Sequence, residues 1–355
     1  MIKKLALLPV LGGLMLLGVG CISFSSDSTG SGTGADGGVF KSANKGDDWA
    51  QKVAVPTTGS RQESIAGVNV STIAQDPQDQ NALYLGTAEN GFFFSYDGGD
   101  SWQRPNQLNT GRINSIAVHP KDKCTVYVTS TNRLMKTEDC SRTWNATYID
   151  TRTDRLTTAV KIDFFNPEIV WVATDAGDVL KSTDAGRSWT NMQTFKSSVM
   201  KLEMVASDSR RVYAATKSSG LWRTDDGGEN WLELSKAYRD FKGAIEFYDL
   251  AVGVSDPSVV VMGSRYGLIR SRDYGATWEA IDLLTPPRST IVYSVAIDPK
   301  DVNTLYYGTN TTFYRTPNGG LNWIPKELPT TRAATVLQVD NVNSNVLYLG
   351  VTKIK

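Results

Sequence analysis

The sequence predicts an all-β fold, a seven-bladed β-propeller of four-stranded antiparallel blades. One motif returns seven times: a hydroxyl residue, an acid or amide two positions later, usually a glycine two positions after that, and a final tryptophan. The seven tryptophans are Trp49, Trp102, Trp144, Trp189, Trp231, Trp278 and Trp323. They lie roughly 42 to 53 residues apart, the length of one blade. A short apolar strand also recurs in each unit, and the two chain ends carry complementary parts of one unit.

The first residues have the layout of a secretory signal. Lys3 and Lys4 precede an apolar run over residues 5–19. This run is shorter and richer in glycine than a membrane-spanning helix, which needs roughly 20 apolar residues. We therefore interpret residues 1–20 as a cleaved signal peptide.

Cys21 directly follows this segment. Small residues that lead into a cysteine resemble the lipobox of bacterial lipoproteins, whose cysteine carries a diacylglycerol group and becomes the new N-terminus. Gly18 stands where leucine is usual, with Leu17 one position earlier. We predict a lipid on Cys21 that anchors the protein to a bacterial membrane on the extracytoplasmic side, in the cell envelope. The alternative is an ordinary secretory signal with an incidental cysteine.

Residues 21–38 predict a flexible tether between the lipid and the folded body. After Cys21 this segment is almost entirely Ser, Gly, Thr and Asp. It cannot bury enough apolar surface to order itself. Residues 39–355 form the propeller, since repeat architectures exceed the usual domain size without splitting.

Each unit has an inner strand that ends in a polar residue and a proline. These pairs are Asp76-Pro77, His119-Pro120, Asn166-Pro167, Asp256-Pro257 and Asp298-Pro299, while the fourth and seventh units carry Ser207-Asp208-Ser209 and Asp340-Asn341. Proline stops the strand because it has no N–H to donate. The apolar run that follows, such as A-L-Y-L-G-T from Ala82, suits a strand buried on both faces. A third strand enters the motif and a fourth follows the tryptophan.

The chain ends predict how the ring closes. The body begins with a third strand, G-V-F-K-S from Gly38, and ends with a second strand near Val346. Pairing these strands completes the seventh blade and leaves no open sheet edge.

Composition excludes several classes of function. Basic and acidic residues balance at 37 each, whereas nucleic-acid binding asks for a basic surplus. His119 is the only histidine, which argues against a histidine-based zinc site and a catalytic triad. We predict no metal, no cofactor, no nucleic-acid partner and a monomeric protein.

Two cysteines flank one predicted hairpin, which turns near Thr131 and Asn132. Counting back from that turn brings Cys124 close to Cys140. An oxidising compartment would favour a disulfide between them. The alternative is two small buried thiols.

The seven motifs resemble the Asp-box, also called the bacterial neuraminidase repeat, of sialidase-like propellers. Their acids and amides are Asn44, Asp97, Asp139, Asp184, Asp226, Asp273 and Asn318. Each should accept backbone N–H groups in a hairpin turn. The glycines should adopt positive φ, and Ser141 replaces one at some cost in strain. We interpret these acids as structural, because a site used once does not need seven copies. The resemblance also implies that the boxes lie opposite any active site.

A glycoside hydrolase is the alternative function, since sialidases and xyloglucanase-type enzymes share these boxes. The F-R-I-P start of sialidases is absent; G-R-I-N at Gly111 lacks its aromatic residue and its proline. Xyloglucanase-type enzymes place two carboxylates between two propellers, and this chain has one. Nothing in the sequence singles out an acid pair, so we predict no catalytic residue.

Boxes in every blade of a single ring, behind a lipoprotein signal, resemble the photosystem II stability/assembly factor-like proteins. This resemblance covers essentially the whole mature chain. It implies a binding or assembly factor whose photosynthetic members use an arginine-rich patch to engage a membrane protein. No motif assigns that patch to residues here. A purely structural envelope protein without a discrete ligand remains a third possibility.

Basic residues recur in most loops that lead into an inner strand. The candidates for binding a protein or anionic glycan are Arg61, Arg112, Arg155, Lys242, Arg288 and Arg332, with Arg152, Lys196 and Arg239 in the same loops. These loops gather on one face of a propeller, so their charge would attract an acidic partner. Tyr238, Phe241 and Tyr293 could add stacking surface. The alternative is that these cations are simply solvated.

Overall fold

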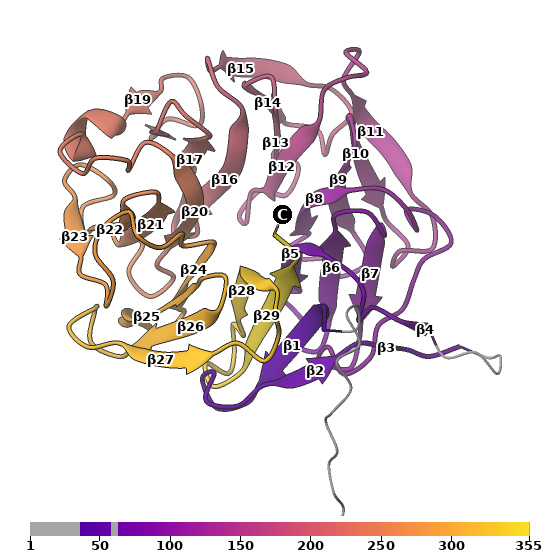
Figure 1. Cartoon of the computed structure of the whole chain (residues 1–355). Coiled ribbons are helices and arrows are strands. Elements are labelled where there is room, and N and C mark those ends of the chain that lie inside the picture. Colours follow the sequence, from indigo (N-terminus) through magenta and orange to yellow (C-terminus); the bar gives the residue numbers. More distant parts are fainter. Residues whose placement is uncertain (1–35, 58–62, 355) are drawn as a thin grey trace, which may run out of the picture. The chain divides into compact units, whose positions relative to one another are not determined.

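The computed structural model describes residues 36–57 and 63–354. Its sheets form a ring of seven blades, which Figure 1 views close to the ring axis. Six sheets have four strands and one has three, so the predicted all-β propeller is confirmed. The predicted signal peptide, Cys21 and most of the tether lie outside the described residues, and the domain boundaries stay predictions. No helix in the described part of the chain is long and apolar enough to cross a bilayer.

The strands of each blade follow one another from the centre of the ring outward. The blade that joins the chain ends contains β28 (Ala333–Val339), β29 (Leu347–Thr352), β1 (Gly38–Ser42) and β2 (Ala50–Lys52). The next contains β5 (Val70–Gln75), β6 (Leu83–Thr87) and β7 (Phe92–Ser95), after a small hairpin of β3 (Ala54–Val55) and β4 (Glu63–Ser64). The third contains β8 (Ile113–Val118), β9 (Val126–Ser130), β10 (Arg133–Thr137) and β11 (Asn145–Ile149).

The remaining four blades repeat this order. They contain β12 (Thr157–Ile162), β13 (Val170–Thr174), β14 (Asp178–Ser182) and β15 (Thr190–Thr194); β16 (Val199–Val205), β17 (Asp208–Thr216), β18 (Leu221–Thr224) and β19 (Leu232–Glu233); β20 (Phe247–Val252), β21 (Val260–Ser264), β22 (Gly267–Ser271) and β23 (Glu279–Ile281); and β24 (Ser294–Asp298), β25 (Asp301–Gly308), β26 (Thr312–Thr316) and β27 (Ile324–Glu327). A short 3-10 helix, η1 (Ser235–Tyr238), follows β19.

The ring closes through the predicted pairing of the two chain ends. Strand β1 runs antiparallel to β29, with Gly38 opposite Val351 and Ser42 opposite Leu347. One blade therefore takes its inner half from the C-terminal end and its outer half from the N-terminal end. This arrangement leaves no unpaired edge between the first and last units.

The second blade departs from the predicted four strands. Its fourth strand is reduced to a single bridge between Phe94 and Gln103. Pro105 follows two residues later and has no N–H to offer a ladder. The three-stranded sheet is therefore a local consequence of the sequence after Trp102.

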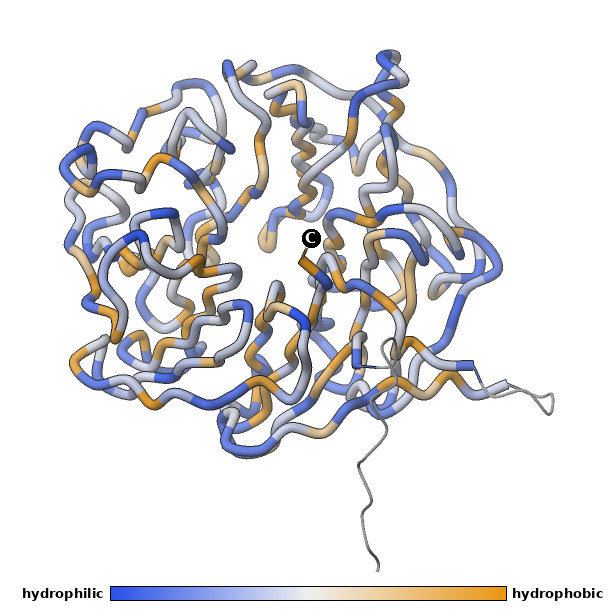
Figure 2. The backbone as a smooth tube through the Cα atoms, in the orientation of Figure 1, coloured by the Kyte–Doolittle hydropathy of each residue, from blue (hydrophilic) through white to orange (hydrophobic). Residues whose placement is uncertain are grey.

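The hydrophobic core lies between neighbouring blades. The second strands β6, β9, β13 and β21 are buried at every position. Figure 2 shows hydrophobic residues along the strands and hydrophilic residues along many of the outer turns. The box tryptophans add to these contacts, as where Trp144 packs edge-to-face on Phe92 of the preceding blade. Burial on both faces explains why these strands read as continuous apolar runs.

The box hairpins have the hydrogen bonding that the motif predicts. In all seven boxes the first hydroxyl accepts the N–H of the residue four positions on at 2.6–3.1 Å. The acid or amide oxygen accepts that hydroxyl and a backbone N–H, as Asp97 does from Ser95 at 2.7 Å and from Ser101 at 2.9 Å. Hydrogen bonds from Thr143 hold the pKa of Asp139 at about 2. The box carboxylates thus accept hydrogen bonds within their own turns and have a structural role there.

Each box is also hydrogen-bonded to the turn between the first two strands of its own blade or to the beginning of the second strand. The residue after the acid or amide donates its N–H to a carbonyl at 2.7–3.2 Å in every blade. The pairs are Lys45–Asn345, Gly98–Asn81, Cys140–Cys124, Ala185–Glu168, Gly227–Arg210, Tyr274–Ser258 and Gly319–Asn303. We call this end of the ring the box face.

In the third blade the same contact is also covalent. Cys124 and Cys140 form a disulfide. Ser141, in place of the usual glycine, has φ +67°, and its buried hydroxyl has no partner in the described part of the chain. The predicted strain at Ser141 is therefore present in this turn.

We predict that Asp97→Asn keeps the stability of the fold at pH 7, whereas Asp97→Ala lowers it by about 1 kcal/mol. An amide oxygen can accept the same N–H groups, as Asn44 does from Asp48 at 2.9 Å. Burial alone would raise the pKa of Asp97, but hydrogen bonds from Ser101 and Ser95 outweigh it and lower the pKa. The stability that the ionised Asp97 carboxylate contributes is therefore complete above the unfolded pKa of about 3.9. This contribution is lost as the pH falls through the lower pKa of the folded state.

Urea unfolding of both variants and the wild type between pH 7 and pH 2 measures this difference. Both variants should lose less stability on acidification than the wild type. Equal destabilisation by asparagine and alanine at pH 7 would contradict the hydrogen-bonding role of the carboxylate.

Candidate binding face

The loops that enter the inner strands lie at the end of the ring opposite the boxes. Inner and second strands are antiparallel, and the turns between them contact the boxes. The starts of the inner strands must therefore be at the other end. We call this end the loop face; its longer connections are residues 103–112, 150–156, 234–246, 282–293 and 328–332.

Five of the predicted loop cations are exposed at the loop face. These are Arg112, Lys196, Arg239, Lys242 and Arg288. None of them forms an ion pair with a carboxylate of the described residues. Arg112 donates from Nε to the amide oxygen of Asn114. The five side chains therefore leave positive charge available to a partner.

Two further loop cations are exposed but paired. Arg155 Nε lies 3.8 Å from Asp154 Oδ2, and Arg152 forms ion pairs with Asp150 and Asp178. The acids that accompany these arginines reduce the net charge of this loop. Arg155 is therefore a weaker binding candidate than the sequence indicated.

The prediction that Arg332 faces a partner is wrong. Its exposed fraction is 7%, and its Nε donates to Asp36 at 3.2 Å. Its Nη1 donates to the carbonyls of Gly67 and Val68 and to Asn69 Oδ1 at 3.0–3.2 Å. The guanidinium joins the entry to β1, the loop before β5 and the start of β28, so it holds the closing blade together.

Arg61 and Cys21 lie outside the described residues, so nothing further follows about either from the structure. Among the predicted aromatic residues, Tyr238 is only 2% exposed and offers no free stacking surface. Phe241 and Tyr293 are half-buried and keep part of their rings accessible.

A central channel of about 620 Å³ runs between the inner strands. A chain of ion pairs lines it across three blades: Lys161 Nζ lies 2.8 Å from Glu203 Oε2, and Lys201 Nζ lies 3.4 Å from Glu203 Oε1 and 2.7 Å from Asp249 Oδ1. Asp249 also accepts the N–H of Val295 in a fourth blade at 2.8 Å. Ion pairs therefore cross-link the channel wall from β12 to β20, and a hydrogen bond extends the link to β24.

The two central groups of this chain of ion pairs, Lys201 and Glu203, stay ionised at neutral pH. Burial disfavours the charge on Lys201, but the attraction of Asp249 and Glu203 outweighs burial and raises its pKa. Burial likewise opposes the charge on Glu203, yet Lys161 and Lys201 lower its pKa. Sequence reasoning missed these residues, because polar residues within inner strands look like ordinary solvent-facing positions. Charges of alternating sign at successive inner strands are the signal that could have revealed them.

The only histidine has a structural contact. His119 Nδ1 accepts the N–H of Lys121 at 3.1 Å in the turn after β8. Burial lowers the pKa of His119. In residues 36–57 and 63–354 there is no cluster of three or more His, Cys, Asp or Glu side chains that could hold a metal ion.

A family model described as photosynthesis system II assembly factor YCF48 matches residues 23–210. The chain belongs to this family. Photosystem II assembly lipoprotein Ycf48 of Synechococcus sp. (strain CC9902) is 27% identical over 172 residues, which are 47% of each chain. The chain thus spans about half the length of this relative.

Solved structures share the fold. A GH74 xyloglucanase from Xanthomonas campestris has a TM-score of 0.67 at 15% identity, over 80% of this chain and 51% of that one. A structure of YCF48 bound to D1 peptide has a TM-score of 0.62 at 14% identity, over 86% of this chain and 98% of that one. At these identities the likeness concerns the fold alone.

We predict that Arg332→Gln destabilises the protein by about 3 kcal/mol, because it removes a buried, hydrogen-bonded charge and leaves Asp36 and two carbonyls without that donor. Arg112→Gln, an equal change at an exposed loop cation, should alter stability by no more than about 0.5 kcal/mol. Urea unfolding at pH 7 measures both. Equal stability of the two variants would return Arg332 to the set of candidate partner-binding residues.

Proposed function

We propose that this protein is a lipid-anchored binding factor of the cell envelope, which captures an acidic segment of a partner protein on its loop face. It acts in the assembly or stability of that partner and catalyses no reaction. The proposal combines the family relationship with the chemistry of the loop face. A solved family structure holds a peptide, which favours a protein partner over an anionic glycan.

The observation that carries the proposal is the set of five exposed loop cations without an ion-paired carboxylate among the described residues. Arg112, Lys196, Arg239, Lys242 and Arg288 enter from four different loops. The opposite end of the ring holds the box acids, several of which keep a pKa of about 2. The exposed loop cations place unpaired positive charge on the loop face, which attracts negative segments.

The same geometry gives less support to a glycoside hydrolase. Such an enzyme needs a carboxyl group with a raised pKa beside a second carboxylate. Glu203 and Asp249 are the carboxylates among the residues that line the channel, and both are bound by Lys201. The xyloglucanase neighbour is about twice as long as the segment it shares with this chain.

The position of Asp36 supports an anchor beside the loop face. Asp36 accepts hydrogen bonds from Thr331 and Arg332 in the loop before β28. A tether from Cys21 would therefore join the propeller at its loop face. That arrangement turns the cations toward a membrane-bound partner.

We predict that protein extracted from native membranes begins at a lipid-modified Cys21, and that it contains the Cys124–Cys140 bond. Intact mass measurement tests both, because the lipid adds a defined mass and reduction adds two hydrogens. Cys21→Ala should abolish the lipid mass. The variant chain should then either be released from the membrane or be retained as the uncleaved precursor. A mature chain that begins at another residue would refute the anchor, and a mass unchanged by reduction would refute the disulfide.

We predict that the triple change Arg112→Glu, Lys242→Glu and Arg288→Glu abolishes binding of a synthetic polyglutamate peptide and capture of the partner from native membranes. Binding by the wild type should weaken as salt shortens the screening length from about 10 Å at 0.1 M to about 3 Å at 1 M. Calorimetry with the peptide and co-isolation of the partner measure the two effects.

The matched control is the triple change Lys123→Glu, Arg142→Glu and Arg187→Glu, which reverses equal charge at exposed positions of the box face. It should leave binding unchanged. Capture that survives the first triple, or that is lost equally in the second, would refute the loop face as the binding surface. Glycan turnover lost on changing one carboxylate would establish the hydrolase instead.

A further inference from the structure

The longest loop-face connection that the structure describes in full contains a small apolar hollow. Residues 234–246 join β19 to β20 through η1 and three successive turns. Within them Tyr238, Phe241, Gly243 and Ile245 line a cavity of about 280 Å³. Ile245 is 46% exposed. Ile245 therefore adds accessible apolar surface to a concave site, a combination that ligand pockets share.

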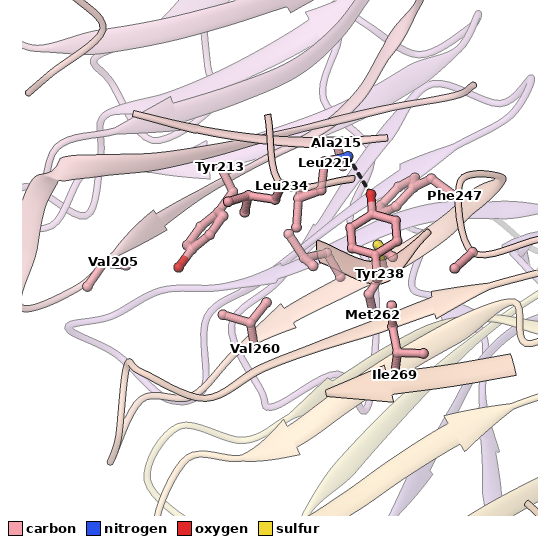
Figure 3. Close-up of a cluster of buried hydrophobic side chains, with 12 residues drawn as sticks. Val205, Tyr213, Ala215, Leu221, Leu234, Tyr238, Phe247, Val260, Met262 and Ile269 are labelled. Carbon is pink, nitrogen blue, oxygen red and sulfur yellow. Dashed lines mark hydrogen bonds between the residues drawn. The ribbon is translucent and has the colours of Figure 1, made fainter. Parts of the chain in front are cut away.

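The floor of the hollow is fixed before any partner arrives. Tyr238 belongs to a buried cluster with Leu221, Leu234 and Phe247, which Figure 3 shows. Its hydroxyl accepts the N–H of Leu221 at 2.8 Å, the dashed line in Figure 3. Its ring packs edge-to-face on Trp278 with centroids 5.4 Å apart. Burial raises the pKa of Tyr238 to about 12, so the floor stays uncharged.

Backbone contacts hold the walls in place. The N–H of Phe241 donates to Tyr238 O at 3.1 Å, and the N–H of Ala244 donates to Phe241 O at 2.9 Å. The Phe241 ring packs on Tyr266 at 5.2 Å. Gly220, which directly precedes β18, lies so close that a Cβ there would be 2.9 Å from the Tyr238 hydroxyl. Such a preformed hollow loses little entropy when it is filled.

The rim of the hollow is cationic. Lys236 and Arg239 line it, and Lys242 follows in the same loop. The Lys236 side chain is 80% exposed and lies 3.6 Å from Glu233, whose carboxylate also accepts the Ser235 hydroxyl. Asp240 and Glu246 are the other acids of the loop, and Glu246 lies 3.9 Å from Arg265. Arg239 and Lys242 have no ion-paired acid among the described residues.

We propose that this hollow is the specificity pocket of the loop face, and that it takes one apolar or aromatic side chain of a protein segment that carries acidic residues beside it. This inference rests on the proposed function, since the loop cations supply the attraction to the acidic segment. The hollow adds selection among acidic segments, because only an apolar anchor displaces its water. Its volume suits a single side chain of leucine or phenylalanine size.

Three capped synthetic peptides test the pocket. The first has a central phenylalanine between glutamates, the second has serine in place of the phenylalanine, and the third has lysines in place of the glutamates. The mature protein should bind the second peptide about tenfold or more weakly than the first, because the side chain is no longer buried. It should not bind the third. In methyl NMR spectra the Ile245 signal should shift with the first peptide and not with the second.

Ile245→Ser should lower the affinity for the first peptide to that of the second and leave the affinity for the second peptide unchanged. A loss of folding would instead lower both affinities. Val254→Ser is the matched control, since Val254 is 58% exposed on the box face. It should leave every affinity unchanged.

The possible failures are distinguishable. Equal affinity for the first two peptides, lost on reversal of Arg112, Lys242 and Arg288, would refute the pocket and leave the proposed function standing. If neither acidic peptide binds, the proposed function itself is refuted. It is also refuted if the acidic peptides bind with an affinity that the reversal of these three charges does not change. Binding of the lysine peptide as tightly as the first would refute the acidic class of partner.

Discussion

Pairing of β1 with β29 is the contact on which the rest of the ring depends. Every other blade is built from residues near one another in the chain, whereas this one joins strands about 300 residues apart. Until it forms, two blade edges are open and the inner strands have no common centre. Arg332 acts at the same place, because its guanidinium joins the first described residue to the last loop before β28. Closure is therefore what brings the separate loops into one face.

The seven boxes give the two ends of the ring different roles. Each box donates a backbone N–H to a carbonyl at or beside the turn between the first two strands. The turns on that side therefore hold the strands of their own blade together. The loops on the other side are also tied to their blades by backbone hydrogen bonds, as from the Ala88 N–H to Asn69 O and from the Lys217 N–H to Ser198 O, yet they vary in length and charge. The hollow in residues 234–246 is one product of this freedom. A constraint repeated on one face thus leaves the other face available for recognition.

Local recurrence explains what could be predicted from the sequence. Blade number, closure and the box hydrogen bonds depend on short patterns, and all three are confirmed. Arg332 was misjudged because its partner Asp36 lies 296 residues away, a contact that no pattern near Arg332 records. The chain of charges at Lys201 and Asp249 needs the order of blades around the channel. The hollow depends on how consecutive turns stack above Tyr238, which polar loop composition conceals.

The attachment of Asp36 at the loop face sets a distance scale for the proposed lipid anchor. A flexible segment of about 15 residues, the number that separates Cys21 from Asp36, spans on average about 20 Å. A lipid on Cys21 would then keep the cations and the hollow within reach of segments that project from the same membrane. Encounter with such a segment becomes effectively intramolecular, at a local concentration on the order of millimolar. Modest affinity at each contact would suffice for capture, and a fast off-rate would let one propeller serve many newly made partners in turn.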